Sequence, residues 1–92
     1  MWYVYIIQCS DNSLYIGSTT DINRRIKEHN SKKGGSYTRI RTPVKLMYQE
    51  RQPDRIAAQK REAQIKRWTR AKKVAFIKHD KVELRNLSIS HD

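Results

Sequence analysis

The chain has 92 residues, with 20 Lys or Arg against nine Asp or Glu, so its formal net charge is +11 at pH 7. This length fits one domain, and no stretch approaches the roughly 20 apolar residues of a membrane span. So much positive charge on a small body attracts polyanions. Nucleic acid is the first candidate partner, ahead of an anionic membrane surface or a basic surface kept for solubility.

The cysteine content indicates a cellular setting. With Cys9 as the single cysteine, no internal disulfide can form, which favours a reducing environment. The opening WYVYII is apolar but short, and it has neither a basic leader nor a small-residue cleavage site. We therefore expect no signal peptide and a cytoplasmic protein without a membrane partner. The oligomeric state, monomer or otherwise, does not follow from the sequence.

Three segments are predicted to be strands. Residues 2–8 combine aromatic and β-branched side chains, and both faces are apolar, so this strand should be covered on both sides. Residues 10–13 carry short polar side chains typical of a turn, and residues 14–16 follow as a second strand in an antiparallel hairpin. Apolar and polar residues then alternate from Val44 to Gln49, which predicts the third strand.

The first helix is predicted to begin at Asp21, whose carboxylate can accept hydrogen bonds from the free N–H groups of the first turn. Its apolar stripe consists of Ile22 and Ile26, and the helix should end near Asn30. Residues 32–42, KKGGSYTRIRT, are basic and show no clear period. We expect a loop there.

Two further helices are predicted after the third strand, one from residue 53 to about residue 68 and a shorter one over residues 71–77. The order β-β-α-β-α-α predicts an α+β fold, with a small antiparallel or mixed three-stranded sheet flanked by helices. We expect one domain over residues 1–80 and a C-terminal tail, residues 81–92, that extends along the surface or is disordered.

Three helical residues are candidates for chemistry. Arg25 and His29 lie four positions apart and share a helix face, although a solvated arginine and a boundary histidine are the plainer interpretations. Glu62 falls within the i, i+4, i+7 apolar stripe of Ala58 and Ile65. Acidic residues are rarely buried without a partner, so Glu62 should pair with an arginine, a lysine or a metal ion. The plain alternative is a salt bridge to Arg25 or Lys66.

The strands contribute tyrosines and one glycine. Tyr3, Tyr5 and Tyr15 lie on neighbouring strands, where tyrosines most often only pack. Gly17 ends a strand ahead of a helix, either as a simple breaker or to let a phosphate approach closely. One cysteine without companion ligands argues against the usual zinc sites, and neither a phosphate-binding glycine loop nor a nucleophile elbow is present.

Taken together, YVY at residues 3–5, YIG at residues 15–17, the helical Arg25 and His29, and the late Glu62 resemble the GIY-YIG nuclease family over residues 2–78, with the closest similarity to its small stand-alone bacterial members. The resemblance implies a three-stranded antiparallel sheet flanked by helices and divalent-metal-dependent cleavage of DNA. It implies these catalytic residues: Tyr5, Tyr15, Arg25, His29 and Glu62. It further implies that Glu62 binds the metal, Mg²⁺ or Mn²⁺.

Two positions depart from the family pattern. Tyr3 replaces the first motif's glycine, and Ser18 follows YIG where some relatives place a lysine that helps the reaction. The second change leaves the proton acceptor open among Tyr5, Tyr15 and His29. A free phenol has a pKa near 10 and would need a nearby cation, whereas a histidine titrates closer to neutrality.

Under this interpretation Arg25 clamps a phosphate oxygen and Glu62 holds Mg²⁺ on the leaving-group side. The flanking nucleic acid, DNA rather than RNA, would be bound by Gly17, Lys32, Lys33, Arg39 and Arg41. The main alternative is a module on the same fold that binds nucleic acid without cleaving it, because charge alone produces salt-dependent binding in either case. A protein-interaction or purely structural domain is the third alternative.

Overall fold

The computed structural model of the chain describes residues 1–33 and 35–79. Its strands are β1 (Trp2–Gln8), β2 (Leu14–Thr19) and β3 (Lys45–Gln52), and its helices are α1 (Ile22–Asn30), α2 (Ser36–Arg39), α3 (Arg55–Lys66) and a further helix over residues 70–79. The strands form one antiparallel sheet in the order β2-β1-β3. The predicted α+β fold and the order of its elements are confirmed, and the tail of residues 81–92 lies outside the described residues.

Helices α1 and α3 are each capped by an aspartate, because the first N–H groups of a helix have no partner within it. Asp21 accepts from the backbone N–H of Arg24 at 3.0 Å, as predicted, and Asp54 accepts from that of Ala57 at 2.8 Å. Helix α3 ends at Lys66, two residues before the predicted end at Trp68.

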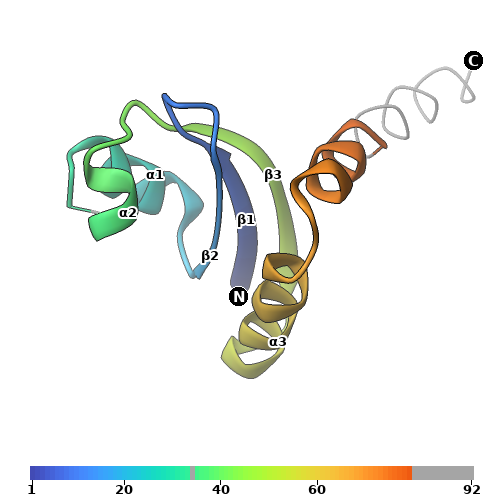
Figure 1. Cartoon of the computed structure of the whole chain (residues 1–92). Coiled ribbons are helices and arrows are strands. Elements are labelled where there is room, and N and C mark those ends of the chain that lie inside the picture. Colours follow the sequence, from blue (N-terminus) through green and yellow to red (C-terminus); the bar gives the residue numbers. More distant parts are fainter. Residues whose placement is uncertain (34, 80–92) are drawn as a thin grey trace, which may run out of the picture.

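The segment expected to be a loop contains one turn of helix. Helix α2 spans only four residues, too few for an apolar period to be recognised in the sequence. It follows Gly35, whose φ of 142° lies in the region that favours glycine. Helix α2 lies next to α1 on the same side of the sheet (Figure 1), where it buries Thr38 completely.

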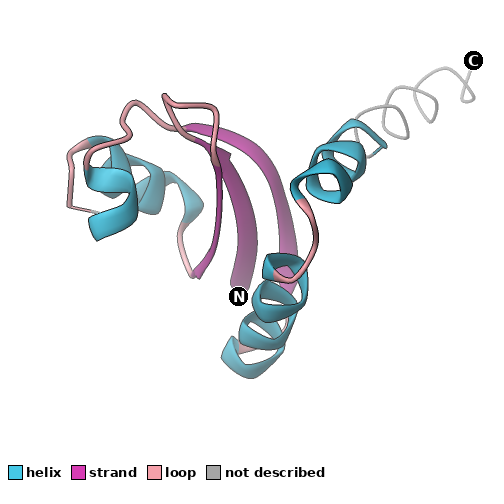
Figure 2. Ribbon diagram, in the orientation of Figure 1, coloured by secondary structure: helices cyan, strands magenta, loops and turns pink. Residues whose placement is uncertain are grey.

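The sheet separates two apolar cores, with α1 and α2 on one side and α3 and the helix of residues 70–79 on the other (Figure 2). Successive residues of β1 point to opposite faces. Val4 and Ile6 pack with residues of α3, while Tyr5 and Ile7 pack with Ile22 of α1. Strand β1 is therefore covered on both faces, as predicted. No helix within the described ranges is long and apolar enough to cross a membrane.

Strand β2 is an edge strand, and its glycine is forced by packing. Tyr5 pairs with Gly17 across the ladder. A Cβ atom at position 17 would lie 2.4 Å from the Tyr5 hydroxyl oxygen and 2.6 Å from the ring carbon that bears it. The Tyr5 ring thus fills the space above Gly17, and only a residue without a side chain lets it do so.

We expect Gly17→Ala to lower the free energy of unfolding by about 1–3 kcal/mol, because an added methyl group in a tightly packed place displaces its neighbours. Urea unfolding measures this change. In a Tyr5→Leu background the same substitution should cost less, since leucine does not reach over position 17. An equal cost in both backgrounds would show that the contact with Tyr5 is not the cause.

Candidate active site

The predicted tyrosines and the two helical residues meet on the α1 face of the sheet. Tyr5 and Tyr15 are diagonal neighbours on β1 and β2, because Tyr5 pairs with Gly17 and Ile7 with Tyr15. The Tyr5 hydroxyl lies 2.9 Å from His29 Nε2 and accepts from Arg25 Nε at 3.4 Å. The Tyr15 ring packs edge-on against the His29 ring at 5.5 Å. The structure therefore brings these four residues together.

His29 is buried completely rather than placed at a boundary. Its second ring nitrogen, Nδ1, lies 2.7 Å from the hydroxyl of Thr38 in α2. Burial, and secondly the nearby charge of Arg25, lower the pKa of His29 from its ordinary value of 6.5. The imidazole is neutral at pH 7, with both nitrogens in hydrogen bonds.

The Tyr5 phenol is also neutral. Burial raises its pKa above the ordinary value of 10.0, although the hydrogen bond and the charge of Arg25 act in the opposite direction. The charges of Tyr15 and Glu62 add smaller contributions that raise it further. The predicted influence of Arg25 on the phenol is present, but desolvation outweighs it.

Arg25 is the charged member of this group. Its side chain is 27% exposed, and one terminal nitrogen forms an ion pair with Glu28 at 3.0 Å. The guanidinium therefore lies at the boundary between the buried cluster and solvent, where a phosphate could approach it. A fork of N–H donors suits that ligand.

Glu62 approaches from the opposite face of the sheet. Helix α3 packs against β2 and β1, and the Ser18 hydroxyl donates to Glu62 Oε1 at 2.8 Å, while Lys66 Nζ lies 2.6 Å from Oε2. The partner is thus Lys66, one of the two predicted. The Glu62 side chain is 20% exposed, so it lies at the border of the apolar stripe rather than in its middle.

The donor set for a metal is sparse. No group of three or more His, Cys, Asp or Glu side chains in residues 1–33 and 35–79 could hold an ion. Glu62 stands alone as a carboxylate, half-buried, with one oxygen toward Ser18 and the other toward an ammonium group. Such a set fits Mg²⁺, which commonly takes one or two carboxylates and fills its remaining positions with water and phosphate oxygens.

The predicted contact residues differ in their surroundings. Lys32, Lys33 and Arg39 are exposed. Arg41 is instead held by the fold, because its Nε bonds Asp11 at 2.9 Å and a terminal nitrogen bonds the Tyr37 carbonyl at 2.8 Å. Its guanidinium also lies 4.1 Å from the centre of the Tyr37 ring. Gly17 faces the Tyr5 ring, and its contact with nucleic acid stays a prediction.

Three residues around the site were not selected from the sequence as site residues. Ser18 was noted only as a departure from the family pattern, and Thr38 and Tyr37 belong to the segment expected to be a loop. Tyr37 stacks on Tyr15 with ring centres 5.7 Å apart. None of these contacts has a local sequence signal, because each joins segments that are distant along the chain.

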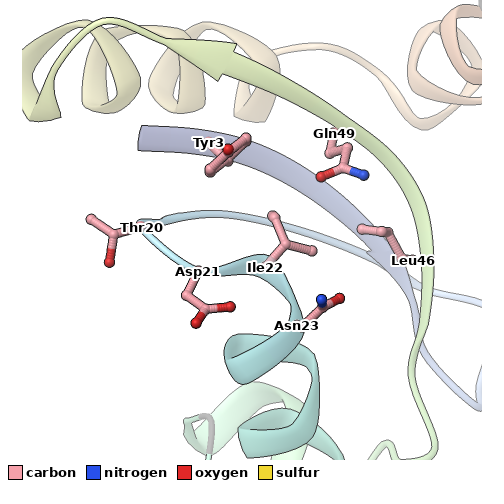
Figure 3. A pocket seen from close by; sticks show the side chains of 7 residues that line it. All are labelled: Tyr3, Thr20, Asp21, Ile22, Asn23, Leu46 and Gln49. Atoms are coloured by element: carbon pink, nitrogen blue, oxygen red, sulfur yellow. The ribbon is translucent and has the colours of Figure 1, made fainter. Parts of the chain in front are cut away.

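A hollow of about 310 Å³ at the start of α1 is separate from this cluster (Figure 3). It is lined by Tyr3, Thr20, Asp21, Ile22, Asn23, Leu46 and Gln49. None of these is a predicted site residue. The predicted catalytic residues gather instead around the edge strand β2.

The buried neutral His29 makes stability depend on pH. In the unfolded chain the His29 imidazole takes up a proton near its ordinary pKa of 6.5. In the folded protein its pKa is lowered, so the imidazole becomes protonated only at lower pH. The unfolded state therefore binds more protons below pH 6.5. We expect the free energy of unfolding to have its full value above that pH and to fall as the pH decreases below it.

Urea unfolding between about pH 8 and pH 5 measures this dependence. His29→Gln, which removes the titrating ring, should flatten it. A wild-type curve without slope below pH 6.5 would contradict the buried neutral state.

Comparisons with known proteins show which family the chain resembles. Residues 1–75 match the model of the GIY-YIG catalytic domain. A UPF0213 protein of Streptococcus sanguinis is 50% identical over 76 residues, which cover 83% of this chain and 87% of that protein. A UPF0213 protein of Haloquadratum walsbyi is 56% identical over 71 residues, which cover 77% of this chain and 80% of that protein.

Two solution NMR structures are similar as well. The UPF0213 protein BH0048 of Bacillus halodurans superposes with a TM-score of 0.55 at 43% identity, covering 85% of this chain and 84% of that one. The protein EF2693 of E. faecalis superposes with a TM-score of 0.58 at 39% identity, covering 87% of this chain and 85% of that one. With most of its length matched by the family model and by these relatives, the chain belongs to the GIY-YIG family.

Proposed function

We propose that the protein is an endonuclease that hydrolyses DNA phosphodiester bonds with the help of Mg²⁺ or Mn²⁺. The observation that carries the proposal is the convergence of Tyr5, Arg25 and His29 on one hydroxyl at the β2 edge, with Glu62 close enough for its charge to affect the same phenol. Membership of a nuclease family supports the reaction class.

Phosphodiester hydrolysis requires three tasks: water must be oriented and deprotonated, charge on the phosphoryl oxygens must be neutralised, and the leaving oxygen must be stabilised. The half-exposed Arg25 would bind a phosphoryl oxygen. The cluster of Tyr5, Tyr15 and His29 would orient the water and accept its proton. Both groups are neutral at pH 7, so His29 could accept a proton directly, whereas Tyr5 could accept one only as a phenolate, after releasing its own.

Glu62 would hold the metal ion, which fits its single half-buried carboxylate. When bound, the ion supplies positive charge that stabilises the oxygens on which negative charge develops. Ser18, whose hydroxyl donates to Oε1, would keep the Glu62 carboxylate oriented toward the β2 edge. The Lys66 ammonium group, 2.6 Å from Oε2, would compete with the ion for this carboxylate.

The substrate is proposed to be DNA. The net charge of +11 favours any polyanion, and the exposed Lys32, Lys33 and Arg39 would hold the phosphates on either side of the cleaved bond. Arg41 would contribute mainly by keeping Tyr37 and α2 in place. A cytoplasmic setting agrees with the buried, unpaired Cys9.

A non-cleaving nucleic-acid-binding module is the second candidate function. It is favoured by the ion pair between Lys66 and Glu62, since in such a module Glu62 needs no role beyond that salt bridge. The two functions differ in what the carboxylate does. A polyanion binder gains nothing from a negative charge beside its phosphate site, whereas a nuclease cannot act without it.

The test compares Glu62→Gln with the wild type on single- and double-stranded DNA and RNA in Mg²⁺ or Mn²⁺. We expect cleavage to fall by more than about a hundredfold, since residues that merely support a metal ligand are worth 10–100-fold, while DNA binding is kept or slightly strengthened. Asp54→Asn is the matched control, because it removes one carboxylate from the same helix and preserves its cap.

If the wild type leaves every substrate uncut while Glu62→Gln binds DNA more tightly, the non-cleaving module is correct. Arg25→Ala adds a second check, because loss of the phosphate clamp should weaken cleavage at every Mg²⁺ concentration.

Lys66→Met tests whether the Lys66 ammonium group competes with the metal ion for the Glu62 carboxylate. Removing the ammonium group that pairs with Oε2 should lower the Mg²⁺ concentration for half-maximal cleavage by up to about fivefold, the range that corresponds to a surface ion pair. Lys60→Met, an exposed position of the same helix, is the control for net charge. A higher Mg²⁺ requirement in Lys66→Met would instead give Lys66 a direct role with the substrate.

A further inference from the structure

A line of hydrogen bonds runs from solvent into the interior of the site. It joins Arg25 Nε to the Tyr5 hydroxyl at 3.4 Å, that hydroxyl to His29 Nε2 at 2.9 Å, and His29 Nδ1 to Thr38 Oγ1 at 2.7 Å. One end is open, since the Arg25 side chain is 27% exposed. The other is closed, because Thr38 and His29 have no exposed surface.

The protons along this line can be arranged in two ways. Arg25 can only donate, so the Tyr5 oxygen accepts from it in both. In the first, Tyr5 donates to His29 Nε2 and His29 Nδ1–H donates to Thr38. In the second, Thr38 donates to Nδ1, and His29 Nε2–H donates to Tyr5. Each leaves one hydroxyl proton without a partner in the line, that of Thr38 in the first and that of Tyr5 in the second.

Burial decides between the two arrangements. Within the described part of the chain, His29 Nδ1 is the one hydrogen-bond partner of the Thr38 hydroxyl. In the first arrangement the Thr38 proton would be enclosed without an acceptor, which is unfavourable in a protein interior. In the second, the remaining proton belongs to Tyr5, which is 1% exposed but whose hydroxyl adjoins the 27% exposed Arg25 side chain. Among the described residues, the Thr38 hydroxyl instead contacts only the enclosed His29 ring.

We infer that Thr38 is a positioning residue that donates to His29 Nδ1 and thereby fixes the imidazole proton on Nε2. His29 and Arg25 then both donate to the Tyr5 oxygen. This inference rests on the proposed function for its last step: two N–H donors stabilise a phenolate, so Tyr5 accepts the proton of the attacking water after releasing its own, and His29 acts as a donor rather than as the base.

The chemistry balances without a further reactant. Tyr5 first loses its hydroxyl proton at the end of the line that adjoins Arg25, a step that burial of the phenol opposes and added positive charge favours. The phenolate oxygen next takes a proton from water as the water oxygen forms its bond to phosphorus, and the bond from phosphorus to the leaving oxygen breaks. His29 keeps its Nε2 proton throughout. The neutral state of the imidazole, favoured by its burial, provides the single ring proton that this arrangement requires.

The experiment reads the tautomer directly by long-range ¹H–¹⁵N NMR on histidine-labelled protein, with the His29 signals assigned by their loss in His29→Gln. We expect the proton on Nε2 in the wild type and in Thr38→Ser, which keeps the hydroxyl. Thr38→Val keeps the shape and removes the donor, so the proton should distribute over both nitrogens. A wild-type proton on Nδ1, or a Thr38→Val tautomer identical to the wild type, overturns the inference.

Cleavage is measured on the same proteins. Thr38→Val should lower the single-turnover rate at least tenfold, and Thr38→Ser should restore it to within a few-fold of the wild type. Equal rates for Thr38→Val and the wild type overturn the positioning role. If the wild type cleaves nothing, the proposed function fails while the NMR result still decides the tautomer. Should Thr38→Val not fold, the wild-type and Thr38→Ser spectra remain decisive.

Discussion

The seating of the Tyr5 ring over Gly17 is the constraint on which the rest of the site depends. Tyr5 belongs to the central strand, yet its hydroxyl reaches the helix α1 residues Arg25 and His29. It can do so because its partner on the edge strand has no side chain, and a Cβ atom there would overlap the hydroxyl. The phenol oxygen is therefore held by close packing of the core and not by a loop.

The same packing controls the charge of the cluster. Burial raises the pKa of Tyr5 and lowers that of His29, so both groups are neutral next to one guanidinium. Arg25 is balanced by Glu28, and Glu62 by Lys66. Under the proposed function this balance links water activation to cation binding, because a buried phenol loses its proton only when further positive charge arrives. Cleavage would then await both the metal and the substrate.

Short-range patterns in the sequence were sufficient for the fold. The apolar run of residues 2–8 predicted β1, and the alternation of apolar and polar residues over 44–49 predicted β3. The aspartate cap with its isoleucine stripe predicted α1, because strand and helix periods depend on neighbouring residues. Helix α2 was missed since one turn carries no period. The end of α3 was misplaced by two residues, where the apolar Trp68 continues the pattern after the helix has ended.

The site was predictable only where residues share an element or a family motif. Arg25 and His29 share a helix face, and the motif placed Tyr5 beside them. Thr38, in contrast, reaches His29 from a segment without a recognisable pattern. The role of Arg41 depends on Asp11, thirty positions away in sequence. Such contacts are products of tertiary structure. His29 and Thr38 are only nine positions apart, but they lie on different helices, so no helix or strand period relates them.

The two halves of the site come from opposite faces of the sheet, and the register of β1 with β2 holds them together. Tyr5 pairs with Gly17, and the adjacent rung pairs Val4 with Ser18. Because neighbouring rungs point to opposite faces, one presents the phenol toward α1 while the other presents the serine that contacts Glu62 of α3. A slip of one residue would exchange the faces. The two cores that bury β1 on both sides therefore also fix the position of the phenol relative to the carboxylate, and the stability of the fold and the geometry of the candidate site depend on the same strand pairing.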